Sequence, residues 1–259
     1  MTEVRYGARS EEARRNRELQ ATSIGVWAQN LTALYETDAE IIAAVLPRPL
    51  EPTSDPLVRV TIATVEIGDR PPFGAGCIAV RAQHEGTVGD YALLMPMTTE
   101  QAVIGGRETF GEPKKLGEVT LSRDGDQIVG AMSRLGVTFV EVRGRVGAAL
   151  ELPEERTTTS FYFKFLLDPS GKGFDAEPSL VYCYRPEQFR RLEQVDGEVI
   201  LRESNFDPVA DLPVRRLVDI TFSERQSQQQ AEIVSRVPAE WLLPFVHQRY
   251  DDLSPLGSR

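Results

Sequence analysis

Short apolar segments separated by turn residues run through most of this sequence, and they constrain its fold more than any other feature. Leu57–Ile67 alternates apolar and polar residues with a period of two, which is typical of a strand with one buried face. Turn residues such as Asp124-Gly125-Asp126, Leu135-Gly136, Arg143-Gly144 and Asp196-Gly197 break the pattern. The other strand candidates lie at residues 24–35, 74–83, 90–97, 119–150 (a meander), 161–167, 181–184, 195–201 and 215–222.

Helical patterns are few and short. The three candidates are Thr37–Val45, Glu100–Gly106 and the closing segment Trp241–Tyr250. Residues 9–20 favour a helix by propensity but contain almost nothing to bury, which indicates an exposed or partner-packed arm. No linker, repeat or shift in composition divides the remainder. We therefore predict a mainly β (α+β) chain, with an N-terminal arm at 1–23 and one antiparallel domain at 24–259.

The charge balance excludes several classes of partner. The 259 residues carry a formal net charge of −10, so no general basic surface is available to hold a nucleic acid. No run approaches the roughly 20 apolar residues of a membrane span. The N-terminus is rich in charge and lacks the apolar core of a signal peptide. These observations predict a cytoplasmic protein that binds neither nucleic acid nor membrane.

Most common catalytic constellations find no support. Cys77 and Cys183 have no Cys or His neighbours at metal-ligand spacing, and we interpret both as buried reduced thiols. The two histidines, His84 and His247, are far apart, and no Gly-x-Ser-x-Gly motif accompanies them. No phosphate-binding loop is present, and the acidic pairs lie in exposed-looking segments. We therefore expect neither a metal site nor a histidine-based triad.

Lysine usage is the remaining chemical signal. Only four of the 29 basic residues are lysines, and two of them, Lys114 and Lys115, are adjacent. Lysine can lose its proton and act as a nucleophile, whereas the guanidinium of arginine stays charged. Apolar neighbours and nearby glycines surround the pair, and both desolvation and a second ammonium favour a neutral amine. A solvated surface pair is the alternative interpretation.

The sequence around these lysines resembles the acetoacetate decarboxylase-like superfamily. The central motif is Gly106-Arg107-Glu108, four further positions, and then Pro113-Lys114-Lys115-Leu116-Gly117. The resemblance extends in order from about residue 33 to 220. Its other matches are Thr37-Asp38, Pro47-Arg48-Pro49-Leu50-Glu51, Pro56-Leu57-Val58-Arg59, Gly89-Asp90-Tyr91 and Asp211-Leu212-Pro213-Val214.

The resemblance implies an antiparallel β cone or barrel around a reactive lysine, assembled as a homo-oligomer. Lys114 would be the Schiff-base nucleophile, and Lys115 the cation that helps to lower its pKa. The substrate would be a small keto acid. No cofactor would be required, because the iminium itself accepts the electrons released in bond cleavage.

Three polar positions expected from the resemblance are neutral in this chain. The arginine before the first strand falls at Ala28, a glutamate falls at Thr61, and a Tyr-x-Glu element falls at Phe73-Gly74-Ala75. Without these groups the site would desolvate Lys114 but would lack the residues that orient a small carboxylate and relay protons. The substrate pocket is predicted to contain Thr61, Phe73, Ala75, Met97, Arg107, Glu108 and Phe110.

Three functions follow from this combination. The first is a cofactor-free Schiff-base lyase that decarboxylates an acetoacetate-like β-keto acid through a Lys114 iminium. The second is an aldolase-dehydratase that uses the same lysine to condense an oxo acid with an aldehyde co-substrate. The third is a small-molecule binding protein that kept the fold and lost turnover. In the two catalytic hypotheses the amine is better supported than the reaction.

Overall fold

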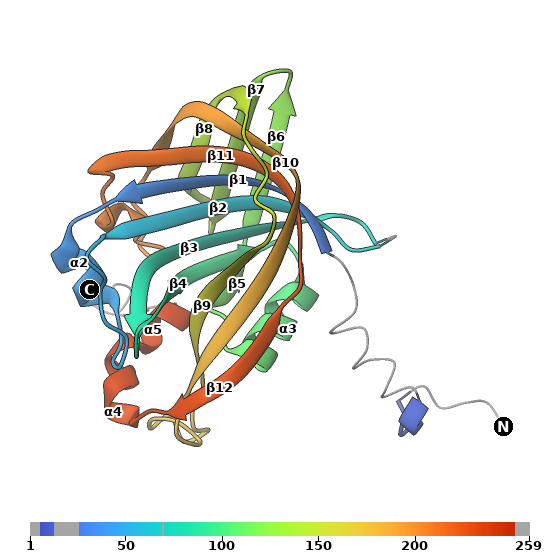
Figure 1. The fold of residues 1–259 in the computed structure, drawn as a ribbon. Helices are drawn as coiled ribbons and strands as arrows, with labels where there is room; N and C mark the ends of the chain where they lie inside the picture. The colour runs from blue at the N-terminus through green and yellow to red at the C-terminus, as the bar shows by residue number, and fades with distance from the viewer. Residues whose placement is uncertain (1–5, 13–25, 69, 252–259) are drawn as a thin grey trace.

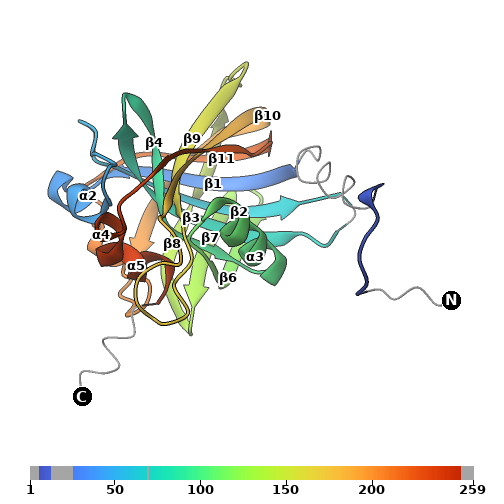
Figure 2. The same ribbon diagram turned by 90° about the horizontal axis from the view of Figure 1, so that it is seen from below.

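One sheet of twelve strands dominates the computed structural model, which describes residues 6–12, 26–68 and 70–251. The sheet is strongly curled, and its strands cross one another from front to back (Figure 1 and Figure 2). In chain order the strands are β1 (Val26–Glu36), β2 (Leu57–Glu66), β3 (Phe73–His84), β4 (Thr87–Met97), β5 (Lys114–Leu116), β6 (Glu118–Asp124), β7 (Gln127–Arg134), β8 (Val137–Ala149), β9 (Arg156–Lys164), β10 (Ser179–Leu201), β11 (Arg216–Ser227) and β12 (Gln230–Arg236).

Strand β10 closes the sheet into a barrel. Its first part pairs with β9 over residues 179–187, and its middle part pairs with β11 over residues 187–194. Strands β11, β1, β2, β3, β4 and β9 are hydrogen-bonded in that order, so the second pairing completes a ring. The predicted fold, a mainly β domain of the cone or barrel type, is therefore confirmed.

Two predicted turns are instead continuous strand. Gly144 lies inside β8 and Gly197 lies inside β10, and the two glycines are paired directly across the strands. A Cβ atom on Gly144 would lie 2.7 Å from the Cα of Gly197, so the backbones approach more closely than side chains allow. These glycines mark a close strand contact rather than a change of direction. The segments predicted at 181–184 and 195–201 consequently belong to one long strand.

The helices are short and lie at the edges of the barrel (Figure 1). Helix α3 extends four residues beyond its predicted end, and the predicted closing helix is interrupted at Pro244 by a 3₁₀ turn. Strand β12 has no counterpart in the sequence prediction, nor has the short strand β5, which begins at Lys114 and Lys115. The helices are α2 (Ala39–Val45), α3 (Glu100–Phe110), α4 (Ala239–Leu242) and α5 (Val246–Arg249).

The two faces of the sheet carry different layers. On β3, Ile78 and Val80 belong to the main apolar core, which lies on the outer face and includes side chains of β6–β8. The alternate residues Ala75, Cys77 and Ala79 point into the barrel and belong to a smaller apolar cluster covered by α3. We call this second side the interior face. It is the face from which the candidate site is built.

The predicted N-terminal arm falls mostly outside the described residues, as do residues 24–25 of the first predicted strand and the C-terminal residues 252–259. Within the described parts of the chain, no helix has the length and apolar character needed to cross a membrane.

Candidate active site

The end of helix α3 fixes where Lys114 begins its strand. Gly111 adopts the left-handed conformation (φ 79°), and its N–H donates to the carbonyl of Arg107 at 3.1 Å, which ends the helix. The chain then turns, and Lys114 begins β5, which runs parallel to β4 with Lys114 opposite Met95. The Met95 N–H donates to the Pro113 carbonyl at 3.1 Å. The backbone on both sides of Lys114 is thereby held.

Glu112 is the direct partner of Lys114. The Lys114 Nζ lies 2.7 Å from Glu112 Oε2, and the exposed fractions of the two side chains are 14% and 1%. The Lys114 N–H also donates to the Glu112 carbonyl at 2.8 Å, which closes a three-residue turn around Pro113. This turn folds the carboxylate back onto the amine. A buried ion pair therefore stands where the sequence predicts a reactive lysine.

Strand β10 and the segment after β11 supply the other side of Glu112. Arg185 Nη2 donates to Glu112 Oε1 at 2.9 Å, and Gln229 Nε2 donates to the same oxygen at 3.1 Å. Arg185 also donates to the hydroxyl of Tyr162 at 2.9 Å. Burial by itself raises the pKa of Glu112, but the charges of Lys114 and Arg185 outweigh it and hold that pKa below its ordinary value. Glu112 is therefore an anion at neutral pH.

Lys115 points to the opposite side of β5 from Lys114, as alternation along a strand requires. Its Nζ lies 2.9 Å from an oxygen of Asp251 and 3.9 Å from one of Asp207. Arg134 binds the same two carboxylates. The structure thus gives Lys115 its own carboxylates and does not place it beside Lys114, and its predicted effect on Lys114 stays a prediction that has to act across the strand.

Four predicted pocket residues come together on the interior face. Phe73, Ala75, Met97 and Phe110 all belong to the apolar cluster beneath α3. Thr61 is half-buried and lies opposite Cys77 in the pairing of β2 with β3. These five side chains therefore share the interior face, whereas their place in a substrate pocket stays a prediction.

Arg107 and Glu108 occupy different positions. Arg107 donates to the carbonyls of Lys114 at 3.0 Å and Arg249 at 3.2 Å, and its guanidinium stacks on the ring of Tyr250. It holds the backbone of β5 against the C-terminal segment. Glu108 is exposed on α3, and both residues line a surface cavity with Lys164. Arg107 is thus a positioning residue for β5, whereas contact of either residue with a substrate stays a prediction.

Both cysteines belong to the apolar cluster on the interior face, and both are free thiols. Burial raises the pKa of Cys77 to about 11, although Arg185 and Arg59 act in the opposite direction. Burial also raises the pKa of Cys183. The thiols are therefore protonated and poorly nucleophilic at neutral pH. Across residues 6–12, 26–68 and 70–251, no cluster of three or more His, Cys, Asp or Glu is arranged to hold a metal ion.

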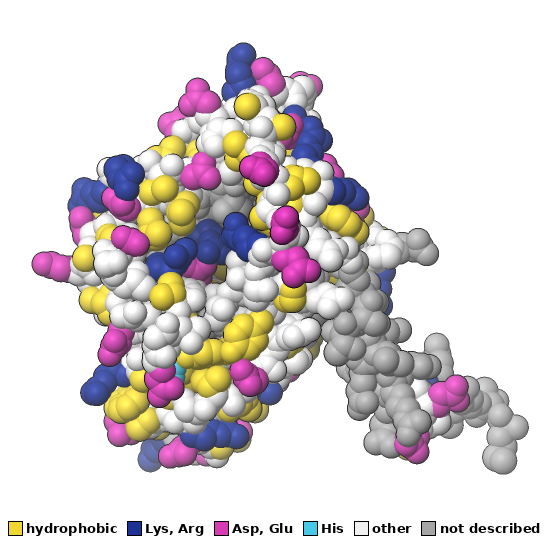
Figure 3. All heavy atoms as spheres, viewed as in Figure 1, with side chains coloured by type: hydrophobic (Ala, Val, Ile, Leu, Met, Phe, Trp, Pro, Cys, Tyr) yellow, Lys and Arg dark blue, Asp and Glu magenta, His cyan; other side chains and the backbone are white. Residues whose placement is uncertain are grey.

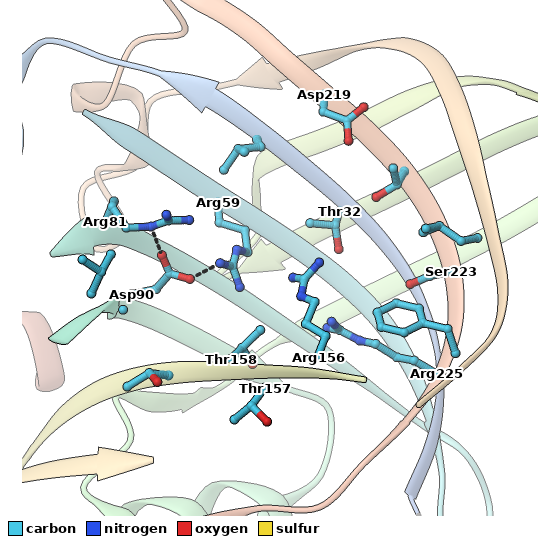
Figure 4. A pocket seen from close by; sticks show the side chains of 17 residues that line it. Thr32, Arg59, Arg81, Asp90, Arg156, Thr157, Thr158, Asp219, Ser223 and Arg225 are labelled. Atoms are coloured by element: carbon cyan, nitrogen blue, oxygen red, sulfur yellow. Dashed lines mark hydrogen bonds and ion pairs between the residues drawn. The ribbon is translucent and has the colours of Figure 1, made fainter. Parts of the chain in front are cut away.

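A cavity of about 390 Å³ opens on the interior face, beyond Arg185. All seven strands of the closed ring contribute to its wall, and Figure 3 shows basic side chains gathered in the hollow. Arg225 on β11 lies directly opposite Ala28 on β1, so a cation from the neighbouring strand stands beside the position where the family resemblance led us to expect an arginine. The residues that line the cavity include Thr32, Arg59, Arg81, Asp90, Arg156, Thr157, Thr158, Asp219, Ser223 and Arg225 (Figure 4).

Two features escaped sequence reasoning. Glu112 could have been suspected from its position two places before Lys114, because a turn at Pro113 folds the two side chains together. The arginine-lined cavity had no local signal. Its cations come from strands far apart in sequence, and only the register of the closed sheet brings them together.

Gly106 on α3 is expected to be essential for the Lys114–Glu112 pair. A Cβ atom at this position would lie 2.5 Å from Cδ and 2.7 Å from Nζ of Lys114, and it would also overlap the Glu112 carboxylate. We predict that Gly106→Ala lowers the rate of any Lys114-dependent reaction about 10²-fold, because the amine is displaced by an ångström or more. Imine trapping by borohydride measures this rate.

The neighbouring Gly105 provides the matched control. A Cβ atom on Gly105 meets nothing within 4 Å, and alanine is favoured over glycine in a helix by about 0.5–1 kcal/mol. Gly105→Ala should therefore leave trapping unchanged and slightly stabilise the protein. Equal rates in the two variants would show that the space at Gly106 has no bearing on the amine.

Comparison with known proteins gives a consistent result. The family model described as acetoacetate decarboxylase (ADC) matches residues 12–237. An acetoacetate decarboxylase of Clostridium botulinum is 35% identical over 103 residues, which cover 38% of this chain and 41% of the relative, so the match spans about two fifths of that protein. One of Burkholderia vietnamiensis is 29% identical over 199 residues, covering 71% of this chain and 76% of the relative.

Solved structures show the same fold at low identity. Acetoacetate decarboxylase from Legionella pneumophila superposes with a TM-score of 0.73 and 16% identity, covering 91% of this chain and 93% of that chain. The enduracididine biosynthesis enzyme MppR, solved in complex with pyruvate, gives a TM-score of 0.68 and 16% identity, with coverage of 82% and 90%. The family model covers most of the chain, with Lys114 inside the matched segment. This protein belongs to the acetoacetate decarboxylase family.

Proposed function

We propose that the protein is a cofactor-free Schiff-base lyase that acts on a keto acid, with Lys114 as the nucleophile and decarboxylation as the default reaction. The observation that carries the proposal is the buried ion pair of Lys114 with Glu112 beside an apolar cluster. The amine is shielded from water by α3, and its carboxylate partner is held in place by Arg185 and Gln229. Family membership supports the same assignment.

Imine formation begins with a proton transfer within the pair. Glu112 accepts a proton from the Lys114 ammonium, and the neutral amine attacks the keto carbon. A proton moves from nitrogen to oxygen in the resulting carbinolamine. Glu112 then returns its proton to the hydroxyl group, which leaves as water and gives the iminium. The sum of these steps converts an ammonium and a ketone into an iminium and one water.

Decarboxylation follows from the iminium. The bond between the α-carbon and the carboxylate breaks, CO₂ leaves, and the electron pair moves into the iminium to give a neutral enamine. The enamine is protonated on carbon, and water hydrolyses the new iminium to release a ketone and the lysine. The apolar neighbours Phe73, Met97 and Phe110 favour the step, because the negative charge of the carboxylate disappears as CO₂ forms.

Borohydride trapping tests the proposal. With acetoacetate present, mass spectrometry should find a reduced adduct on Lys114, and an isopropyl group would record an imine that has already lost CO₂. Lys114→Arg keeps the positive charge beside Glu112 but cannot form an imine, so it should give no adduct. Lys172→Arg, on the exposed Gly171-Lys172-Gly173 turn, should behave as wild type. Absence of any adduct with several oxo acids would overturn the assignment.

Aldol condensation followed by dehydration is the second candidate. The neutral residues Ala28, Thr61 and Ala75 motivate it, since they stand where charged groups were expected from the family resemblance. MppR, which shares the fold, has been solved with the condensation product of pyruvate and an imidazole aldehyde. Formation of an unsaturated oxo acid from pyruvate and an aldehyde, with little CO₂ released from acetoacetate, would favour this reaction. A protein that binds keto acids yet gives no adduct would fit the non-catalytic alternative.

A further inference from the structure

The barrel interior carries the opposite charge to the chain as a whole. The protein has a formal net charge of −10, yet the cavity beyond Arg185 is lined by four arginines and two aspartates. The arginines are Arg59, Arg81, Arg156 and Arg225, and the aspartates are Asp90 and Asp219. Positive charge concentrated in a concave, partly enclosed site attracts anions from solution.

The carboxylates present do not neutralise these arginines. Asp90 is shared between Arg59 and Arg81, and the buried Glu187 is shared between Arg156 and Arg225. Each carboxylate therefore faces two cations.

Asp219 accepts a hydrogen bond from Gln194 at 2.7 Å, and in Figure 4 it lies at the far rim, away from Arg156 and Arg225. An excess of positive charge is left at the centre of the cavity.

Arg225 lies among several like charges. Burial lowers its pKa, Glu187 opposes that effect, and the guanidinium groups of Arg59, Arg156 and Arg185 lower the pKa further. Several like charges in one partly buried space repel one another unless an anion lies among them. Guanidinium groups bind carboxylates in a bidentate manner, and Arg59, Arg156 and Arg225 point into one space (Figure 4).

The cavity and the lysine site lie along one continuous face. On β10, Val181 and Cys183 belong to the apolar cluster, Arg185 binds Glu112, and Glu187 supports the cavity wall. Alternate residues of a strand share a face, so these four side chains form one row. The interior therefore changes from apolar, through the Lys114–Glu112 pair, to cationic.

We propose that the cationic cavity binds a second carboxylate of the substrate, so that the enzyme prefers an oxo diacid to a monoacid such as acetoacetate. The inference rests on the proposed function, because it assigns the keto group to Lys114 and the distal carboxylate to Arg59, Arg156 and Arg225. Hydroxyl groups of Thr32, Thr158 and Ser223 also line the cavity and supply further donors. Its volume of about 390 Å³ accommodates more than a four-carbon acid.

Pairs of matched acids test this proposal. Linear 3-oxo diacids of six to eight carbons are compared with 3-oxo monoacids of the same length, by borohydride trapping at Lys114. We expect at least one diacid to be trapped at about tenfold lower concentration than its monoacid partner, since a charged hydrogen bond is gained. Equal trapping of every pair would overturn the diacid assignment and leave the lysine chemistry standing. Absence of trapping by both series would contradict the proposed function instead.

Arg156→Gln is the decisive variant, and Arg190→Gln is its control. Both arginines are about half exposed, with side-chain exposed fractions of 47% and 52%. Each pairs with one glutamate, Glu187 or Glu224, and each stacks on an aromatic ring, but only Arg156 lines the cavity. Arg156→Gln should remove the preference for diacids, whereas Arg190→Gln should keep it. Loss of the preference in both variants would contradict a role specific to the cavity.

A non-reactive diacid separates a substrate subsite from an effector site. Glutarate carries two carboxylates and no keto group, so it can bind the cavity without forming an imine. Competition between glutarate and a trapped diacid, lost in Arg156→Gln, is the result expected for a substrate subsite. Glutarate binding that changes the rate without competing would assign the cavity to a separate effector and overturn the proposal.

Discussion

Glu112→Gln is expected to destabilise the protein by roughly 3–5 kcal/mol, because it leaves Lys114 and Arg185 without their shared anion in a buried site. Removing one partner of a buried pair leaves an uncompensated charge, and the glutamine amide cannot replace the lost carboxylate. Urea unfolding monitored by circular dichroism measures the loss. Glu108→Gln is the control, because Glu108 is an exposed residue of α3. Its free energy of unfolding should stay within about 0.5 kcal/mol of the wild-type value.

The same substitution has a defined dependence on pH. The pKa of Glu112 in the folded protein lies below its ordinary value of 4.5, despite the opposing effect of burial. Its contribution to stability is therefore fully present above pH 4.5 and is lost as the pH falls through the folded value. The difference in unfolding free energy between wild type and Glu112→Gln should consequently become smaller in acid. A difference that stayed constant from pH 7 to pH 3 would contradict the ion pair.

Glu112→Gln should also slow catalysis. The maximum trapping rate should fall by about 10²-fold, because no group remains to accept and return the proton during imine formation. Trapping is measured at a temperature at which the variant is fully folded, so a wild-type rate there would contradict this role of Glu112.

Asp207→Asn is expected to have the second large effect, a loss of roughly 3 kcal/mol in the free energy of unfolding. Asp207 is 1% exposed, accepts from Arg134 Nε at 2.9 Å, and lies 3.9 Å from Lys115 Nζ. Its neutralisation leaves both cations with the carboxylate of Asp251 alone. Because Lys115 adjoins Lys114 on β5, trapping should also slow. Asp126→Asn, which affects exposed contacts with Arg145 and Gln127, should change stability by less than about 0.5 kcal/mol.

Asp251 makes the stability of the ion-pair cluster of Lys115, Arg134, Asp207 and Asp251 depend on pH. Burial alone would raise the pKa of Asp251, but Arg134 and Lys115 hold it below the ordinary value of 3.8. The stabilisation from this carboxylate is present above pH 3.8 and disappears as the pH falls through the folded value. An Asp251→Asn variant should therefore be less stable than wild type at pH 7 and approach wild type in strong acid. An equal loss of unfolding free energy at pH 7 and in strong acid would argue against an ion pair of Asp251 with Arg134 and Lys115.

The sequence predicts the fold well where alternation is strong. On β3, Ile78 and Val80 face the main core and Ala75 and Cys77 face the interior, as a period of two requires. Prediction fails where a glycine can either form a turn or allow two strands to approach closely. Gly144 and Gly197 suggested turns, yet they allow two backbones to approach within one sheet, and nothing local distinguishes the two uses.

The candidate site likewise contains features that the sequence predicts and features that it does not. Lys114 and the apolar residues around it follow from a local motif and from alternation. The partners that decide its charge do not, because Arg185 and Gln229 lie more than 70 positions away along the chain and reach Glu112 only after the barrel has closed. Lys115 is adjacent to Lys114 in sequence, but consecutive residues of a strand point to opposite sides, so adjacency alone does not bring the two amines together.

The length of β10 has a consequence for substrate selection. Arg185, which contacts Glu112, and Glu187, which supports the cavity arginines, are two residues apart on this strand. Their separation is therefore about 7 Å, set by the strand repeat itself and clamped by pairing to strands on both sides. If the substrate is a diacid, as proposed above, the backbone of β10 fixes the spacing between the lysine site and the cationic cavity. Substitutions of the cavity arginines should then change the preference for charge more than the preference for chain length.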